Sequence, residues 1–382
     1  MLGRREAIHI LGKAILAGGT AFIAWRSRVF QVAVFLIAAG LRRCRRANVT
    51  GPANRAAEWE HVQSPTILSP PLNALALVTY HPEYHEFDPS RAIISLVAAR
   101  RLGVGWLRTD VRWYAVLPAG DVPDRRALAW YKGLLSAASG CGFKNMVVLS
   151  SPPNAVLSQS SSKKLESWSR FVEIVSDELG IWCGAYQLFN EPNNPVYGFF
   201  PFQEAVPALI GGASIVHRAN RLAEVAINIS MDIWGWREYL DAFLQHSGSS
   251  IDIVGVDHYP GTWTVGRNDR WSEVIELAET IASASPGSPW FRRRLAIIET
   301  GFCTNTPFRD ERRQAEYFER VATVIGQLKR RLAPGAALLG IYELCDRDSS
   351  AWLDPEAHFG LLTSQLQVKR AYSTVAHLLT SL

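Results

Sequence analysis

A regular alternation of short apolar runs and longer amphipathic stretches most constrains how this chain folds; it begins near residue 74 and continues to the C-terminus. Short runs rich in Val, Ile and Leu are typical of buried parallel strands, and the stretches between them have helical periodicity. Eight such pairs predict a closed (β/α)8 TIM barrel. Strands are expected at 74–80, 104–109, 144–150, 184–190, 224–230, 252–258, 294–299 and 337–343, and helices at 90–102, 126–140, 163–179, 203–221, 234–246, 270–284, 310–332 and 366–380.

A doubly wound open sheet is the alternative α/β architecture for this alternation. Such a sheet usually carries a glycine-rich phosphate-binding turn after its first strand. Here the first predicted strand ends in Thr79-Tyr80-His81-Pro82, which contains no glycine. The closed barrel is therefore the favoured prediction.

The N-terminal part of the chain differs from the rest. Residues 6–25 and 29–41 are apolar and flanked by arginines, which is typical of a signal or membrane-anchor segment. We divide the chain into this segment at 1–46, a linker at 47–71 and the barrel at 72–382. The chain is then expected to be membrane-anchored or exported, with membrane association through residues 6–41. A helical hairpin packed on the barrel is the alternative, and cleavage of the segment stays open.

Charge and cysteine content exclude several functional classes. The net charge is +5, but many of the excess arginines lie within the first 46 residues, so no nucleic-acid-binding face is expected. The five cysteines lack the short spacings of zinc and redox motifs. His81 and His85 have no third ligand at metal spacing. We expect no catalytic metal and no cofactor.

Two acidic motifs end strands on the face where barrel active sites lie. Gln187 to Pro195 reads QLFNEPNNP, and a second apolar run, Ile297 to Phe302, reads IIETGF. Two carboxylates that face each other across a pocket suit cleavage of a glycosidic bond, with one protonated to donate to the leaving oxygen and one ionised to attack. We assign Glu191 as the acid/base and Glu299 as the nucleophile. A carboxyl separation of about 5–5.5 Å would give retention, and about 6.5–9.5 Å inversion.

Other polar and aromatic residues at the predicted strand ends and loops are candidate sugar contacts. Arg108 and Tyr259 are expected beside Glu299, and Asn190 is expected to bind the sugar 2-hydroxyl, an interaction that strengthens in the transition state. Aromatic rings stack well on the apolar face of a sugar. The remaining candidates are Tyr80, His258, Trp263, Glu343 and Trp352.

Asn190-Glu191-Pro192 and Glu299 resemble the signature of clan A glycoside hydrolases, over about residues 74–375. The resemblance implies a (β/α)8 barrel and retaining hydrolysis, with the strand 4 glutamate as acid/base and the strand 7 glutamate as nucleophile. Arg108 and His258-Tyr259 match further positions of the clan. Three segments resemble the family 39 and exopolysaccharide-hydrolase branch: Ile341 to Leu344, His358 to Leu362, and Lys369 to Tyr372. Tyr342-Glu343 departs from the tryptophan that often lies there.

The favoured function is therefore a retaining glycoside hydrolase that cleaves β-glycosidic bonds in a polysaccharide or oligosaccharide. The loops at 193–202 and 260–269 are long enough to line an open cleft, which favours cleavage within a chain. One alternative is a transglycosylase with the same site, and another is a catalytically silent carbohydrate-binding barrel in polysaccharide synthesis. The sugar and its linkage are not determined by the sequence.

Overall fold

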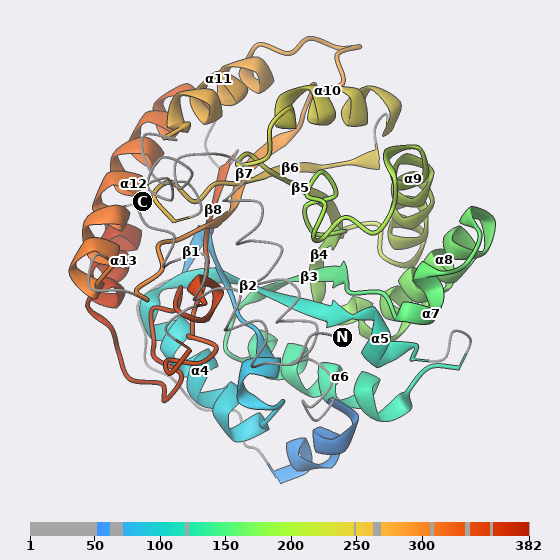
Figure 1. The fold of residues 1–382 in the computed structure, drawn as a ribbon, viewed down its shortest axis with the longest axis horizontal. Coiled ribbons are helices and arrows are strands. Elements are labelled where there is room, and N and C mark those ends of the chain that lie inside the picture. Colours follow the sequence, from blue (N-terminus) through green and yellow to red (C-terminus); the bar gives the residue numbers. More distant parts are fainter. Residues whose placement is uncertain are drawn as a thin grey trace, which may run out of the picture.

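The computed structural model describes residues 52–61, 72–118, 122–247, 250–262, 269–305, 309–332, 337–351 and 354–381. Within them, eight parallel strands close into a barrel in chain order, and helices surround it (Figure 1). The predicted (β/α)8 barrel is confirmed, and the open sheet is excluded. The strands are β1 Asn73–Thr79, β2 Val104–Arg112, β3 Lys144–Ser150, β4 Cys183–Leu188, β5 Glu224–Ser230, β6 Ile253–Asp257, β7 Arg294–Thr300 and β8 Ala337–Ile341.

The helices follow the predicted stretches closely. Asp88 caps α4 (Pro89–Leu102) by accepting from the main-chain nitrogens of Ser90 and Arg91, and Gly103 ends that helix with a left-handed φ of 92°. The helices are α4 Pro89–Leu102, α5 Trp113–Val116, α6 Arg125–Gly140, α7 Asn154–Leu157, α8 Ser161–Leu179, α9 Phe202–Ala219, α10 Trp236–Ser247, α11 Trp271–Ala282, α12 Glu311–Arg331 and α13 Arg370–Ser381.

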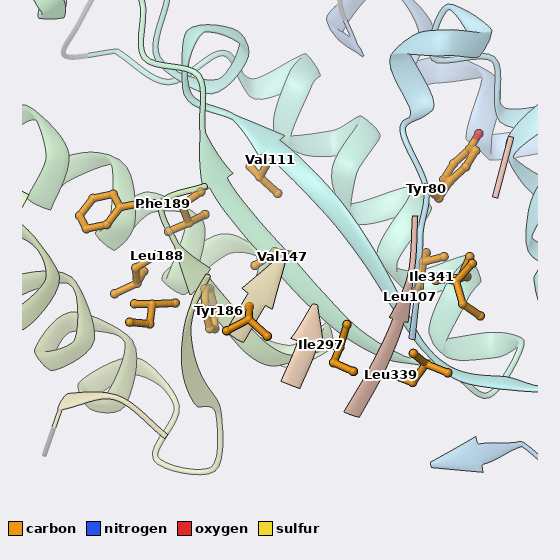
Figure 2. Close-up of a cluster of buried hydrophobic side chains, with 14 of the residues drawn as sticks. Tyr80, Leu107, Val111, Val147, Tyr186, Leu188, Phe189, Ile297, Leu339 and Ile341 are labelled. Atoms are coloured by element: carbon orange, nitrogen blue, oxygen red, sulfur yellow. The ribbon is translucent and has the colours of Figure 1, made fainter. Parts of the chain in front are cut away.

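Strand side chains alternate between two cores. Figure 2 shows outward side chains such as Leu107, Val147 and Ile297, which pack in the layer between barrel and helices. A separate inner cluster takes residues from every strand, so it fills the barrel interior. Its members are Leu77, Trp106, Met146, Ala185, Ala226, Ile253, Ala296, Ile298 and Leu338.

A polar layer lies above this inner cluster, toward the C-terminal ends of the strands. Strand side chains alternate with a period of two, so positions two residues beyond an inner apolar residue also point into the barrel. In β2, β4 and β5 these positions are Arg108, Gln187 and Asn228, and all three are buried. The alternation therefore places charged and amide groups directly beneath the catalytic face.

Residues 52–61 lie within the predicted linker but are packed on the barrel. They form a 3-10 helix, η1 (Pro52–His61), in which the Trp59 ring meets the Trp130 ring of α6 edge-on, with centroids 5.8 Å apart. A Cβ on Gly133 would lie 2.5 Å from the Trp59 ring, so glycine there allows this close contact. The apolar indole explains why this part of the linker docks.

The predicted signal or anchor segment at 1–46 lies outside the described residues, and so stays a prediction. Among the residues that the structure does describe, no helix combines the length and apolar character required to cross a bilayer. Trp263 and Trp352, two predicted sugar contacts, also lie outside the described residues.

Candidate active site

A strained turn at the end of β4 presents the candidate acid/base. Phe189 and Glu191 have positive φ values of 78° and 45°, which are unusual for residues with a side chain. The turn is held by side chains: Gln187 Nε2 donates to the Phe189 carbonyl at 2.9 Å, and the Glu191 main-chain nitrogen donates to Asn228 Oδ1 at 2.9 Å. Backbone strain of this kind persists where surrounding groups determine the conformation, commonly at functional sites.

Glu299 lies at the end of β7 with two partners that stabilise a negative charge. Arg108 Nη2 lies 2.6 Å from Glu299 Oε1, and the Tyr259 hydroxyl donates to Oε2. Burial alone would lower the pKa of Arg108, but Glu299 and Asp110 raise it above its ordinary value, so the guanidinium stays charged. Burial and then Glu299 raise the pKa of Tyr259 well above its ordinary value, so the phenol keeps its proton for this bond. The predicted grouping of Arg108, Tyr259 and Glu299 is thus what the structure shows.

Glu191 lies in the opposite electrostatic environment. Its side chain is 4% exposed, and its Oε2 accepts a hydrogen bond from Asn194 Nδ2 at 2.7 Å. Burial and the nearby charge of Glu299 raise the pKa of Glu191 to about 8. At neutral pH this carboxyl is therefore predominantly protonated, as a general acid must be. Because the charge of Glu299 contributes to this raised pKa, the two carboxyls lie near each other.

Asn190 is oriented by three donors. Its Oδ1 accepts from Arg108 Nη2 at 3.1 Å, Gln187 Nε2 at 3.2 Å and Asn228 Nδ2 at 3.0 Å. Because the amide oxygen is committed to the protein, the amide nitrogen is the end left to donate to a ligand. Gln187 and Asn228 were not among the sequence-predicted site residues. Strand period two would have placed them inside the barrel, but it gives no reason to pair them with Asn190.

Tyr80 lies in the core and not with the catalytic pair. Its side chain is 1% exposed and packs in the layer between the barrel and α4, where Figure 2 shows it. The preceding residue, Thr79, takes the inward position and accepts a hydrogen bond from Arg108 Nη1 at 3.2 Å. Since neighbouring strand residues face opposite ways, Tyr80 must face the helices.

His258 has no nitrogen left for a sugar. The residue is fully buried, its Nε2 accepts from the Arg270 main-chain nitrogen at 3.0 Å, and its Nδ1 lies 3.3 Å from Asp232 Oδ1. The accepting nitrogen identifies a neutral ring that donates through Nδ1. The ring therefore anchors the start of α11 and the loop after β5.

Glu343 lies in a separate polar cluster at the β1 and β8 edge of the face. Its side chain is 1% exposed, its Oε2 lies 3.6 Å from His81 Nε2, and neither oxygen has a hydrogen-bond partner within the described residues. Burial and then Glu356 raise the pKa of Glu343 well above its ordinary value. The ring of the preceding Tyr342 meets the Tyr259 ring edge-on, with centroids 5.7 Å apart.

A pocket of about 480 Å³ opens beside the acid/base, beneath the loop after β4. Asn194 lines it and also donates a hydrogen bond to the Glu191 carboxyl, so the pocket lies next to the acid/base. Its walls are largely aromatic and proline residues, and it is large enough for a sugar unit. The lining residues are Lys164, Pro192, Asn193, Asn194, Pro195, Gly198, Phe199, Phe200, Pro201, Phe202 and Tyr239.

The described residues contain no group of three or more His, Cys, Asp or Glu side chains placed to hold a metal ion. The expectation that the site holds no metal stays a prediction.

No family model and no curated protein matches this sequence. Solved structures share its fold. A β-glycosidase, BGL167, matches with a TM-score of 0.59 at 18% identity, covering 87% of this chain and 94% of that one. A family 5 glycoside hydrolase from Streptomyces cattleya, solved with Manβ1-4GlcNAc, gives 0.63 at 17% identity and 80% of both chains. A family 39 glycoside hydrolase from Bacteroides cellulosilyticus WH2 gives 0.58 at 17% identity, covering 81% and 64%.

Proposed function

We propose that this protein is a retaining glycoside hydrolase that cleaves β-glycosidic bonds in a polysaccharide or oligosaccharide. The observation that carries the proposal is the pair of buried carboxyls with opposite surroundings. Glu299 has a guanidinium and a phenol to stabilise its charge, whereas burial and Glu299 keep the proton on Glu191. The resemblance of both motifs to clan A and the shared fold with solved glycosidases support the same activity.

In the first step, a Glu299 carboxylate oxygen attacks the anomeric carbon while Glu191 transfers its proton to the departing glycosidic oxygen. The bond from the anomeric carbon to the leaving group breaks as the ester to Glu299 forms. In the second step, Glu191 takes a proton from water, the water oxygen attacks the anomeric carbon, and the ester bond breaks. Arg108 and Tyr259 hold the Glu299 carboxylate before attack and after release.

Asn190 is the proposed contact for the sugar 2-hydroxyl. Its amide nitrogen faces away from the three donors that fix its oxygen, so it can donate without a change of rotamer. An amide that is already oriented loses little entropy on binding, and its bond strengthens as charge develops at the sugar ring. Glu343, Trp263 and Trp352 stay proposed contacts for more distant parts of the substrate.

A hydrolysis screen tests the proposal. Wild-type protein is assayed on 4-nitrophenyl β-glycosides and soluble β-glycans beside Glu191→Gln, Glu299→Gln and a control, Glu319→Gln, on the exposed face of α12. We expect turnover by wild type and control, β-configured product by NMR, and a loss of about a thousand-fold or more in both site variants. Wild-type rates in Glu299→Gln, or α-configured initial product, would refute the assignment.

A transglycosylase with the same site is a second candidate, favoured by the pocket beside Glu191. A sugar held there could supply the hydroxyl that attacks the glycosyl ester in place of water. Product sizing over time separates the two activities, because transfer produces chains longer than the substrate. Glycan binding without turnover would instead support the silent carbohydrate-binding barrel.

We also propose a membrane-anchored or exported location. The support is the sequence alone, in the apolar residues 6–41 and their flanking arginines. Fractionation of cells that express the whole chain, beside a variant lacking residues 1–46, tests it. Loss of the membrane or exported fraction in the shortened variant is expected, and equal distribution would contradict the proposal.

A further inference from the structure

A third carboxyl lies beside the catalytic pair and has no role in the reaction described above. Asp257 ends β6 and is fully buried. The register of β6 and β7 shifts after Val256, so that Asp257 pairs directly with Glu299. Neighbouring strands lie about 4.8 Å apart, and paired residues of parallel strands face the same side. Both carboxyls therefore point into the barrel at the same level.

The contacts of Asp257 do not suit a charged group. Oδ2 accepts one hydrogen bond, from Asn228 Nδ2, and Oδ1 is buried with no hydrogen-bond partner in the described part of the chain. No ion pair joins Asp257 to a cation among those residues, because the nearby Arg108 guanidinium is engaged by Glu299. Burying an unpaired charge is far more costly than burying a neutral acid.

The groups that face Asp257 come from several elements. Glu299 follows on β7, Glu191 on the turn after β4, Arg108 on β2 and Tyr259 just after β6. Burial, Glu299 and Glu191 raise the pKa of Asp257 well above its ordinary value, and Arg108 opposes them only in part. One guanidinium cannot balance three carboxylates in this volume, so two of the three carboxyls must be neutral at rest.

Asn228 connects Asp257 to the catalytic turn. Its Nδ2 donates to Asp257 and to Asn190 Oδ1, whereas its Oδ1 accepts from Gln187 Nε2 at 2.7 Å and from the Glu191 main-chain nitrogen at 2.9 Å. All four hydrogen-bonding positions of this amide are used. Reversing the Asn228 amide would break all four hydrogen bonds together. By accepting from Nδ2, Asp257 fixes the orientation of this amide, and thereby also holds Asn190 and the strained Glu191 backbone.

We propose, on the premise of the proposed hydrolase, that Asp257 stays a neutral acid with its proton on Oδ1, and acts as a positioning residue through Asn228. It contacts neither substrate nor reacting atoms. Its neutrality also matters for Glu191, because in the second step Glu299 is an uncharged ester and a charged Asp257 would be a second negative charge that opposes the ionised Glu191. An uncharged oxygen acceptor is all that Asn228 needs from this position.

Matched substitutions test the proposal. Asp257→Asn keeps the shape and an oxygen acceptor without charge, and we expect kcat/KM within about 3-fold of wild type and an unchanged basic limb of the pH profile. Asp257→Leu keeps the volume but removes the acceptor, and we expect kcat to fall about 10-fold or more with KM little changed. If Asp257 were charged, its replacement by Asn would remove a negative charge near Glu191 and lower the pKa of the basic limb by about one unit, which would contradict the proposal. A wild-type kcat in Asp257→Leu would show that Asp257 has no positioning role.

Infrared difference spectroscopy keeps the test independent of turnover. The difference spectrum of wild type minus Asp257→Asn at pH 7 should contain the carbonyl band of a protonated carboxylic acid. Carboxylate bands in its place would overturn the proposal. Glu191→Gln, compared in the same way, assigns the second protonated acid. A wild-type protein without hydrolase activity would refute the proposed function and leave this protonation state still measurable. Circular dichroism and thermal unfolding of each variant identify any that fail to fold.

Discussion

Glu191 and Glu299 are both almost fully buried, yet their partners give them different protonation states. Arg108 and Tyr259 reach Glu299, whereas the hydrogen bond to Glu191 comes from the neutral amide of Asn194. An amide donor stabilises a carboxylate less than a guanidinium does. At the scale of single residues, the division between acid and nucleophile therefore follows from which of the two carboxyls the Arg108 guanidinium reaches.

The pH dependence of activity follows from Glu191. A general acid must be protonated in the free enzyme, and the pKa of Glu191 is raised to about 8. We expect kcat/KM to be constant just below this pH and to fall tenfold per pH unit above it. A pH–rate profile on a natural β-glycan, where protonation of the leaving group is required, measures it. A basic limb below about pH 6 would contradict the environment described for Glu191.

The same pKa makes a prediction for stability. The ordinary pKa of a glutamate is 4.5, and in the folded protein that of Glu191 is raised to about 8, so the folded state holds a proton that the unfolded state releases between these values. Stability is then lost as pH rises through that window. Glu191→Gln has no such proton and does not lose this stability. The free energy of unfolding of the variant minus that of wild type should therefore rise by about 1 kcal/mol or more from pH 5 to pH 8.

Urea unfolding of both proteins at the two pH values measures this difference, and Glu319→Gln on exposed α12 is the control. An unchanged gap between Glu191→Gln and wild type would show that Glu191 is not held protonated by the fold.

At the scale of elements, Gly255 of β6 leaves room inside the barrel for the Ile298 side chain of β7. A Cβ on Gly255 would lie 2.3 Å from Ile298 Cδ1 and 2.6 Å from the Ile227 carbonyl oxygen. Gly255→Ala should lower the free energy of unfolding by about 1–3 kcal/mol, because overpacking forces side chains and backbone apart. Gly211→Ala in α9 is the control, since a Cβ there meets nothing within 4 Å. Equal thermal midpoints for both variants would contradict the described packing.

The pocket lined by the loop between β4 and α9 leads to a prediction about recognition of the leaving group. If its pocket holds a sugar of the leaving group, Tyr239→Ala should lower kcat/KM on β-linked oligosaccharides by about 10-fold. Turnover of a 4-nitrophenyl glycoside, whose leaving group is a single ring, should change little. Trp234→Ala is the aromatic control, because that side chain is 82% exposed and outside the pocket. Equal losses on both substrates would show that the pocket has no leaving-group role.

Strand ends were the part of the site that the sequence predicted best. Apolar runs that end in Glu191 and Glu299 indicate both the strand and the face, and Arg108 follows from the same reasoning. The sequence predicts Tyr80 on the catalytic face, because a run of apolar residues does not reveal which of two adjacent side chains points into the barrel. Thr79 takes that place.

Interior polar residues were missed for a related reason. Gln187, Asn228 and Asp257 lie within apolar runs, where a lone polar residue gives no sign of its partners. Their roles depend on hydrogen bonds between strands that are far apart in the sequence, and on the register shift between β6 and β7. Contacts of this kind require coordinates.

At the scale of the whole molecule, closure of the barrel brings β2, β4 and β7 to one face and so assembles the site. An apolar inner cluster supports a layer of amides and one guanidinium, and that layer orients the two glutamates above it. Few of these groups are exposed, so the preorganisation needed for charge stabilisation exists before a sugar binds. The central claim is the separate roles of Glu191 and Glu299.

Azide rescue followed by NMR tests that claim most directly, with a 4-nitrophenyl β-glycoside that wild type cleaves. Azide should restore turnover of Glu299→Ala and give the α-glycosyl azide, because it attacks from the face that the missing nucleophile occupied. In Glu191→Ala it should intercept the glycosyl ester and give the β-glycosyl azide. The reverse pair of configurations, or wild-type hydrolysis by Glu299→Ala, would contradict the account.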